Sequence, residues 1–248
     1  MKRHNLHTHT TFSDGLLSPD QLVKTAKHRD LEILGISDHA FSTKLPEPMQ
    51  ITNCINLYLA QLRRVQQTSD NLDIKIGIEI DVSRIYGIKP SQLPFKVLNE
   101  FDYILFEYVN TENEDWGKIG GRDISEITHV RHKLKLPIGL AHNDLQQNYG
   151  GREEQIVTLL ADYDIFIELC QSESRPWQKR LHRGVGRNTR DGLDYYQHFS
   201  QILIKELVSN EVKVVVGTDS HSGESLVQFD GVYAFIQKHN LYCHEIVL

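Results

Sequence analysis

Short runs of β-branched and apolar residues alternate along the chain with segments in which apolar residues recur every three or four positions. Runs of the first kind are typical of buried strands, and segments of the second kind are typical of amphipathic helices. The runs predict strands at residues 4–7, 31–37, 73–80, 102–109, 137–141, 164–170 and 212–217. The periodic segments predict helices that begin near residue 19 and lie at 52–67, 124–134, 153–163, 192–208 and 226–239.

The first predicted helix has a well-defined start. Ser18 is expected to be its N-cap, Pro19 stands at the first helical position, and Gln21 stands where a capping box requires it. The alternation of strands and helices predicts a parallel sheet covered by helices. A chain of 248 residues has a normal length for one barrel-type α/β domain, so a single domain over residues 1–248 is expected.

Composition narrows the class of protein. Hydrophobic residues make up 40% of the chain and charged residues 24%, which favours a packed core over disorder. The net charge of −6 argues against a general nucleic-acid-binding surface, although it leaves room for a local anion site. Three widely spaced cysteines favour a reducing compartment, and no apolar region follows the basic start of the chain. No run approaches transmembrane length, so we expect a cytoplasmic protein without a membrane partner.

Residues of the types that bind metals follow the predicted strands. His7 and His9 end the first strand and project to the same side, because strand side chains repeat every two residues. Later strands end in further groups of this kind, namely His39, Glu79, His142 and Asp219-Ser220-His221, and Ser13-Asp14-Gly15 follows the first pair. In parallel α/β barrels the carboxyl ends of the strands meet at one rim, so these side chains should form one cluster. Mixed imidazole and carboxylate ligands suit zinc, manganese or iron, and their number suits two or three ions.

The order of these motifs resembles that of the PHP (polymerase and histidinol phosphatase) superfamily. Residues 7–15 are similar to its first motif, 36–40 to the second, 77–79 to part of the third, 141–143 to the fourth and 217–221 to the fifth. The resemblance extends from residue 4 to about residue 240. It implies a distorted (β/α)7 barrel with a trinuclear metal centre. It also implies phosphoesterase chemistry, in which a hydroxide that bridges the ions attacks phosphorus.

The resemblance further implies a set of ligands. The first ion would be held by His7, His9, Glu79 and Asp219, the second by Glu79 and His142, and the third by Asp14, His39 and His221. Catalysis is assigned in the same way to His7, His9, Asp14, His39, Asp219 and His221. Asp38 is expected to orient His39 or its neighbours. Glu168 is expected to be a buried carboxylate that either supports a ligand or belongs to an ion pair.

The fourth strand departs from the family pattern. The family normally has a histidine at its end, whereas residues 101–110 here end in Glu-Tyr-Val-Asn. Asn110 lies one residue beyond the usual position and is a weak zinc ligand. Glu107 lies two residues before that position and therefore shares its strand face, so we expect Glu107 to be the substitute ligand. The alternatives are a depleted second site, which would leave two ions, and an ordinary surface carboxylate.

Binding of phosphate requires cationic groups beyond the metals. Residues 175–190 contain seven basic residues, counting His182 with six Arg and Lys residues, and no acidic one, and they follow the sixth predicted strand. This segment could clamp a polyanion, with Arg175 nearest the strand end and Trp177 available for stacking, or it could be a solvated surface. Arg84 is a second candidate for contact with substrate. Arg122 belongs to a long loop that could form a lid or an ordinary surface.

The sequence is compatible with three functions. The leading hypothesis is a phosphomonoesterase that acts on a small phosphorylated metabolite, with histidinol phosphate as one example within the family. A nucleotide phosphodiesterase or exonuclease is the second, favoured by the basic segment 175–190 and disfavoured by the net charge of −6. A metal-binding module without catalytic activity is the third, and its support is the altered end of the fourth strand.

Overall fold

The computed structural model describes residues 2–43, 54–110, 120–171 and 194–243. Its strands are β1 (His4–Asn5), β2 (Ile33–Ile36), β3 (His39–Ala40), β4 (Asp73–Asp81), β5 (Tyr103–Glu107), β6 (Ile138–Leu140), β7 (Ile165–Cys170) and β8 (Val214–Gly217). Its α-helices are α1 (Pro19–His28), α2 (Ile55–Gln67), α3 (Phe95–Leu98), α4 (Ile124–Val130), α5 (Leu145–Tyr149), α6 (Glu153–Asp162), α7 (Gln201–Ser209) and α8 (Asp230–His239). The short 3-10 helices are η2 (Pro90–Gln92), η3 (Arg131–Lys133) and η4 (Tyr195–His198).

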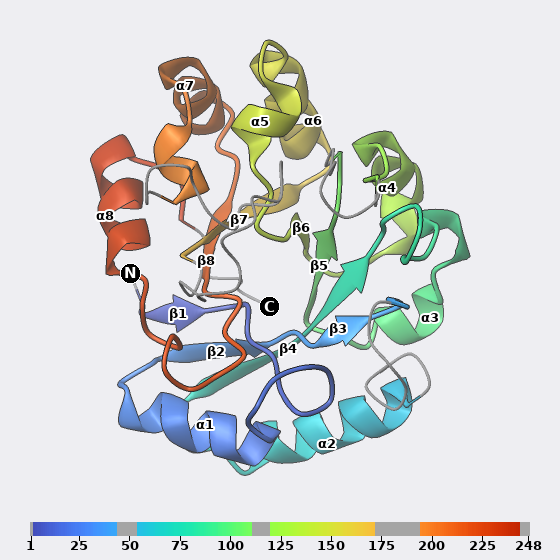
Figure 1. Ribbon diagram of the computed structural model, residues 1–248, viewed down its shortest axis with the longest axis vertical. Coiled ribbons are helices and arrows are strands. Elements are labelled where there is room, and N and C mark those ends of the chain that lie inside the picture. Colours follow the sequence, from blue (N-terminus) through green and yellow to red (C-terminus); the bar gives the residue numbers. More distant parts are fainter. Residues whose placement is uncertain (1, 44–53, 111–119, 172–193, 244–248) are drawn as a thin grey trace.

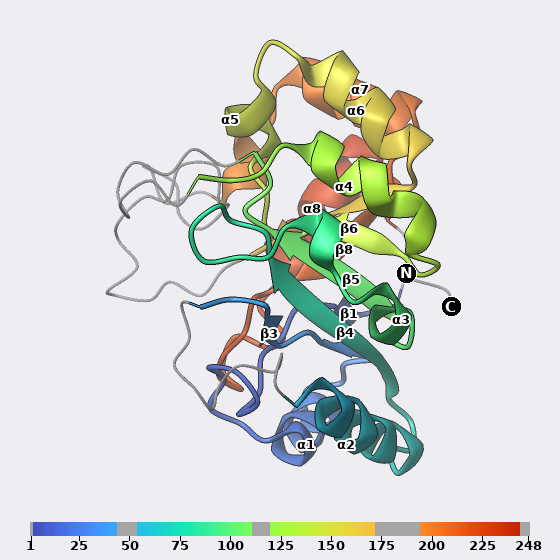
Figure 2. The same cartoon turned by 90° about the vertical axis from the view of Figure 1, so that its right-hand side faces the viewer.

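The strands form a parallel, nearly closed barrel. Their order is β1-β2-β4-β5-β6-β7-β8, and β3 pairs with β4 beyond the end of β2. The backbone amide of Leu6 donates to the carbonyl of Val216 at 2.9 Å, which joins the two ends of the sheet. Figure 1 shows the helices around the outside of this barrel, and Figure 2 shows α1 and α2 at the opposite end from α6 and α7, with the strands between them. The predicted α/β barrel is confirmed.

A tyrosine fills the barrel interior below the strand ends. The ring of Tyr103 is fully buried, and its hydroxyl donates to the backbone carbonyl of Leu6 at 2.6 Å. A Cβ atom at Gly77 would lie 2.6 Å from Cε1 of this ring, and one at Gly35 would lie 2.7 Å from Cα of Leu6. Glycine is therefore required at both positions because a side chain there would overlap the packed interior.

The helix boundaries differ from the predictions in three places. The predicted helix 124–134 is an α-helix only as far as Val130 and continues as the 3-10 helix η3. The predicted helix 192–208 is divided into η4 and α7, because Ser200 begins a new helix by accepting a hydrogen bond from the amide of Leu203. The predicted helix 226–239 begins only at Asp230. The short helices α3 and α5 were not predicted, since neither is long enough to show a helical period. The capping box at Ser18 is confirmed.

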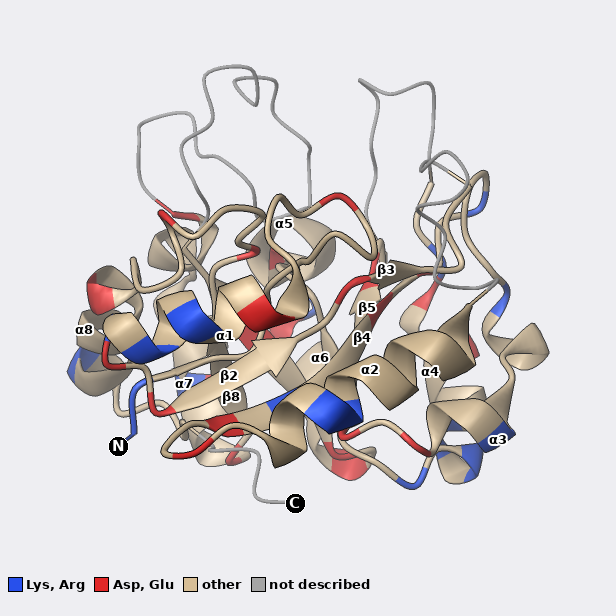
Figure 3. Ribbon diagram, turned by 90° about the horizontal axis from the view of Figure 1, so that it is seen from below, with Lys and Arg blue, Asp and Glu red and all other residues tan. Residues whose placement is uncertain are grey.

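Charged residues are distributed unevenly over the fold. Figure 3 shows Lys and Arg on outer helices, including α1, α2 and α3, and acidic positions at the strand ends near β3 and β5. Buried carboxylates, among them those of Glu79, Glu107 and Asp219, lie at the carboxyl rim of the barrel. Within the described ranges, no helix combines the length and the hydropathy needed to cross a membrane.

We expect the substitution Gly77→Ala to lower the free energy of unfolding by about 1–3 kcal/mol, because its methyl group would overlap the Tyr103 ring. Urea denaturation followed by circular dichroism would measure the loss. The matched control is Gly231→Ala in α8, where the nearest heavy atom is 3.3 Å away and alanine favours the helix. Equal stability of the two variants would contradict the packing described for the barrel interior.

Candidate metal centre

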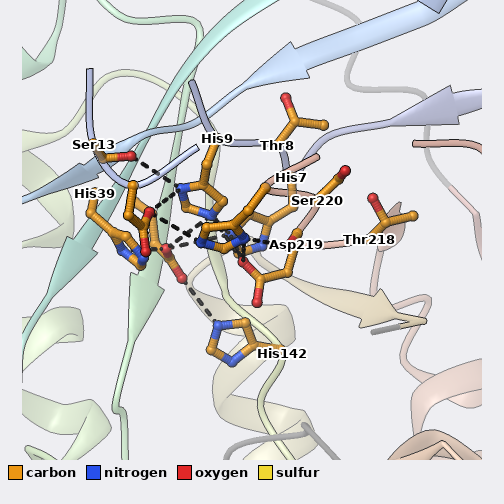
Figure 4. A network of polar contacts seen from close by, with 12 residues as sticks. His7, Thr8, His9, Ser13, His39, His142, Thr218, Asp219 and Ser220 are labelled. Carbon is orange, nitrogen blue, oxygen red and sulfur yellow. Dashed lines mark hydrogen bonds and ion pairs between the residues drawn. The ribbon is translucent and has the colours of Figure 1, made fainter. Parts of the chain in front are cut away.

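The predicted strand-end residues converge at the carboxyl rim of the barrel. The loop after β1 supplies His7, His9 and Asp14, β3 supplies His39, β4 supplies Glu79, β5 supplies Glu107, the loop after β6 supplies His142, and the loop after β8 supplies Asp219 and His221. All of these side chains except that of Asp14 are less than 10% exposed. Figure 4 shows the imidazoles of His7, His9 and His39 around one centre, with His142 approaching from another side.

Two local features orient these side chains. The strand β3 is separate from β2, and its register places His39 directly beside Glu79 of β4. The carboxylate of Asp38 accepts hydrogen bonds from the amide of Thr10 at 2.6 Å and from Oγ of Ser13 at 2.6 Å, which holds the loop after β1 in place. Asp38 therefore supports neighbours of His9, whereas the prediction allowed for a contact with His39.

A first group of potential ligands consists of His7, His9, Glu79 and Asp219. Nε2 of His9 lies 2.9 Å from Oδ1 of Asp219, and Nε2 of His7 lies 3.4 Å from Oε2 of Glu79. The two Nε2 atoms of His7 and His9 face each other at 3.0 Å. Nitrogen and oxygen donors that point at a common position in this way could hold one cation.

A second group is formed by His39, Glu79 and Glu107, whose donor atoms are close enough to share one ion, together with the neighbouring His142. Nε2 of His142 is 3.1 Å from Oε1 of Glu79 and 3.9 Å from Oε1 of Glu107. Glu107 is 1% exposed, so its interpretation as a surface carboxylate is wrong. Oδ1 of Asn110 instead accepts hydrogen bonds from the amide of Ile124 and the hydroxyl of Tyr149, which directs this side chain to α4 and α5.

A third group consists of His9, Asp14, His39 and His221. Oδ1 of Asp14 lies 3.1 Å from Nε2 of His221 and 3.8 Å from Nε2 of His39. The Asp14 side chain is 32% exposed, whereas the other members are almost fully buried. Asp14 is therefore the most solvent-exposed residue of the cluster.

The orientation of two imidazoles supports a role as ligands. Nδ1 of His7 faces the carboxylate of Glu168 at 2.9 Å, and Nδ1 of His221 faces the backbone carbonyl of Asp219 at 2.8 Å. An acceptor at Nδ1 selects the tautomer that carries its proton there. The Nε2 atoms then present lone pairs to the cluster, as ligation requires.

Several of the buried donor atoms lack hydrogen-bond partners within the part of the chain that the structure describes. They are Oδ1 of Asp14, Nδ1 of His39 and Oε2 of Glu79. Nδ1 of His39 and Oε2 of Glu79 lie 2.7 Å apart without hydrogen-bond geometry, and a bound cation is one way to satisfy such buried polar atoms. The donor set therefore fits divalent transition metals.

Electrostatic effects inside the cluster are strong. Burial and the neighbouring imidazoles of His221 and His39 lower the pKa of His9 to about 3. Burial opposes protonation of His39 too, but the carboxylates of Glu79 and Asp14 outweigh it and raise that pKa to about 9. Against the effect of burial, neighbouring imidazoles, with that of His39 first, hold the pKa of Glu79 well below its usual range. The Glu79 carboxylate is thus ionised and can bind a cation.

The arginines considered as contacts for substrate differ in their exposure and in their partners. Arg84 is exposed, and its Nε donates to the backbone carbonyl of Gly121 at 3.2 Å. Arg122 is buried and forms an ion pair of 3.5 Å with Glu126 of α4. Arg175 and the rest of the basic segment 175–190 lie outside the described residues.

The chain thus has the architecture of a parallel α/β barrel whose carboxyl rim carries buried imidazoles and carboxylates, and it falls in the class of proteins with a candidate polynuclear metal centre. The profile of the PHP domain family matches residues 5–238, so the chain belongs to that family.

Two curated proteins are similar in sequence. The uncharacterised protein MJ1295 of Methanocaldococcus jannaschii is 22% identical over 226 residues, which cover 91% of this chain and 84% of that protein. The 5'-3' exoribonuclease Rnm of Salmonella typhimurium is 34% identical over 83 residues, which cover 32% of this chain and 28% of that protein.

Two solved structures share the fold. Histidinol phosphate phosphatase of Lactococcus lactis, in complex with zinc, L-histidinol and phosphate, matches with a TM-score of 0.66 and 17% identity, covering 97% of this chain and 94% of that one. The putative histidinol phosphatase of Listeria monocytogenes matches with a TM-score of 0.59 and 15% identity, covering 93% of this chain and 99% of that one.

Metal binding should release protons. Because the pKa of His39 is about 9 in the metal-free protein, this imidazole is protonated at about pH 8 and must lose its proton to act as a ligand. Affinity for zinc should therefore fall as the pH is lowered below that pKa. Calorimetric titration with zinc in two buffers of different ionisation enthalpy would measure the released protons. A heat of binding that is the same in both buffers would contradict ligation by His39.

Proposed function

We propose that this chain is a metal-dependent phosphoesterase, and most simply a phosphomonoesterase that acts on a small phosphorylated metabolite. The observation that carries the proposal is the arrangement of three adjoining groups of potential ligands at one barrel rim, all buried except Asp14, with Glu79 shared between groups. Adjacent divalent ions held there would lower the pKa of a water molecule and neutralise the oxygens of a phosphoryl group.

The proposed ligand assignment follows the three groups. The first ion would be held by His7, His9, Glu79 and Asp219, the second by Glu79, Glu107 and His142, and the third by Asp14, His39 and His221. His39 Nδ1 also lies 2.7 Å from Oε2 of Glu79, so this imidazole connects the second and third groups. Two or three ions of zinc, manganese or iron suit this set.

The chain's own residues would prepare the site for phosphate. The carboxylates of Glu79 and Glu107 would hold neighbouring ions from two sides, because both lie near the carboxyl ends of the paired strands β4 and β5. The loop held by Asp38 keeps Asp14 at the more exposed edge of the cluster, which is the expected side of substrate entry. Fixed donors of this kind stabilise charge without reorganisation during the reaction.

A small substrate is supported by likeness of fold. The Lactococcus lactis protein, whose structure contains phosphate and L-histidinol, matches nearly the whole length of this chain. We therefore place a small phosphomonoester ahead of a polymer as the substrate. Histidinol phosphate is the first compound to test.

A nucleotide phosphodiesterase or exonuclease is the second candidate. The local similarity to the Salmonella typhimurium exoribonuclease, 34% identical over 83 residues, is the observation that favours it. The basic segment 175–190 would suit a polyanionic substrate. A metal-binding module without catalysis is the third candidate, and it would bind ions but turn over no phosphate ester.

A panel of phosphate esters would separate these candidates. With zinc, manganese or iron added, we expect turnover of small phosphomonoesters such as histidinol phosphate to exceed that of dinucleotides. The variant His7→Ala/His9→Ala should bind fewer ions and lose at least about 1,000-fold in kcat/KM, because it lacks two ligands. His28→Ala, an exposed position in α1, is the control. Preference for dinucleotides would favour the second candidate, and full activity of the double variant would contradict the metal centre.

Glu107 can be tested separately. We expect Glu107→Gln to lower the affinity of the second site by about 100-fold, since a neutral amide is a poor transition-metal ligand. Metal content after dialysis should then fall by one ion per chain. Glu100→Gln, an exposed position before β5, should keep the native content. If Glu107→Gln also keeps the native content, Glu107 is no ligand.

A further inference from the structure

A buried carboxylate on β7 lies behind the cluster without belonging to any of its ligand groups. Glu168 is 1% exposed. Its Oε1 and Oε2 lie 2.9 and 3.0 Å from Nδ1 of His7, and Oε2 also accepts a hydrogen bond of 2.7 Å from the backbone amide of His142. Both oxygens are thus used, and one carboxylate contacts a residue of the first group and a residue of the second.

The fold leaves a specific space for this carboxylate. A Cβ atom at Gly217, the last residue of β8, would overlap Oε1 of Glu168 and lie 2.8 Å from Cβ of His7. The absence of a side chain at Gly217 therefore lets the carboxylate reach His7. On the other side, β7 pairs with β6 in parallel, which brings Glu168 beside the residues that follow β6.

The contact with His142 is made at an unusual backbone conformation. His142 has a φ of 28°, which is uncommon for a residue with a side chain. Such a conformation is maintained only where the surroundings determine it. The hydrogen bond from its amide to Glu168 is one such determinant, and it helps to aim the imidazole at Glu79.

We propose that Glu168 is a positioning residue that serves two ions at once, and this inference rests on the proposed metal centre. It holds His7 in the tautomer with a proton on Nδ1, and it holds the backbone of His142 so that Nε2 faces Glu79. Glu168 makes no such contact with the third group, His9, Asp14, His39 and His221. A change at Glu168 should therefore weaken the first and second ions and leave the third unaffected.

The alternative is a purely structural ion pair between His7 and Glu168. A structural pair would affect the stability of the metal-free protein and leave the affinity for metals unchanged. Glutamine is the informative replacement, because Glu168→Gln keeps the size of the side chain but replaces one acceptor oxygen by a donor. The neutral amide removes the negative charge that stabilises a proton on Nδ1 of His7, and it places an N–H donor where one of the two oxygens now faces that atom.

The test is a cobalt(II) titration followed by visible absorption, with total bound metal measured by equilibrium dialysis. In Glu168→Gln we expect two ions to bind about 10–100-fold more weakly than in the native protein and one ion to bind equally well. Tyr195→Phe is the matched control, since the Tyr195 hydroxyl donates to the backbone carbonyl of Glu168, whereas the carboxylate contacts His7 and the amide of His142. The control should bind metal like the native protein.

Three results would overturn the inference. One is native affinity at all sites in Glu168→Gln, whatever its thermal stability, and another is an equal loss at all sites. If the variant does not fold, nitrogen-15 NMR of the native zinc-loaded protein decides. A protected proton on Nδ1 of His7 supports the inference, and a proton on Nε2 overturns it. A native protein that binds no metal would overturn the proposed function itself, so the two failures are distinguishable.

Discussion

The carboxylate of Glu79 is the group on which the rest of the site depends. It is fully buried, yet its oxygens lie 2.7 Å from His39 and 3.1 Å from His142. An ionised carboxylate in the interior is costly unless positive charge and hydrogen bonds surround it. The imidazoles around Glu79 supply part of that compensation, and cations would supply the rest. The same requirement explains why the ligand groups adjoin each other at this residue and do not form separate sites.

The barrel places these groups through the position of β4. This strand is paired along its length, first with β2, then with β3 on the same side and with β5 on the other. Register then sets His39 beside Glu79 and Glu107 beside Asp81. Because backbone hydrogen bonds fix the register, the spacing of the ligands is a property of the sheet and changes little with surface substitutions. The glycines that admit Tyr103 and Glu168 show how closely the interior is fitted around this arrangement.

Much of this arrangement could be predicted from the sequence, because strand ends in a parallel barrel meet at one rim and the ligand residues follow apolar runs. Side-chain alternation also indicated that Glu107, rather than Asn110, faces the cluster. The break between β2 and β3 could not be predicted, since a short apolar run does not show where one strand ends and the next one, paired with the same β4, begins. The partners of Asp38 and Glu168 are distant in sequence, and no local pattern identifies them. The division of the helix at Ser200 was missed because its apolar period continues through the new cap.

Binding of adjacent divalent ions by the buried cluster is tested most directly by anomalous X-ray diffraction from crystals grown with manganese and phosphate. Two or three anomalous peaks are predicted in the cluster, one between His7, His9 and Asp219, and another beside Glu79 and His142. The phosphate should lie against these peaks on the side of Asp14, where the cluster is most exposed. Crystals with manganese in solution but no anomalous peak in the cluster would contradict the account.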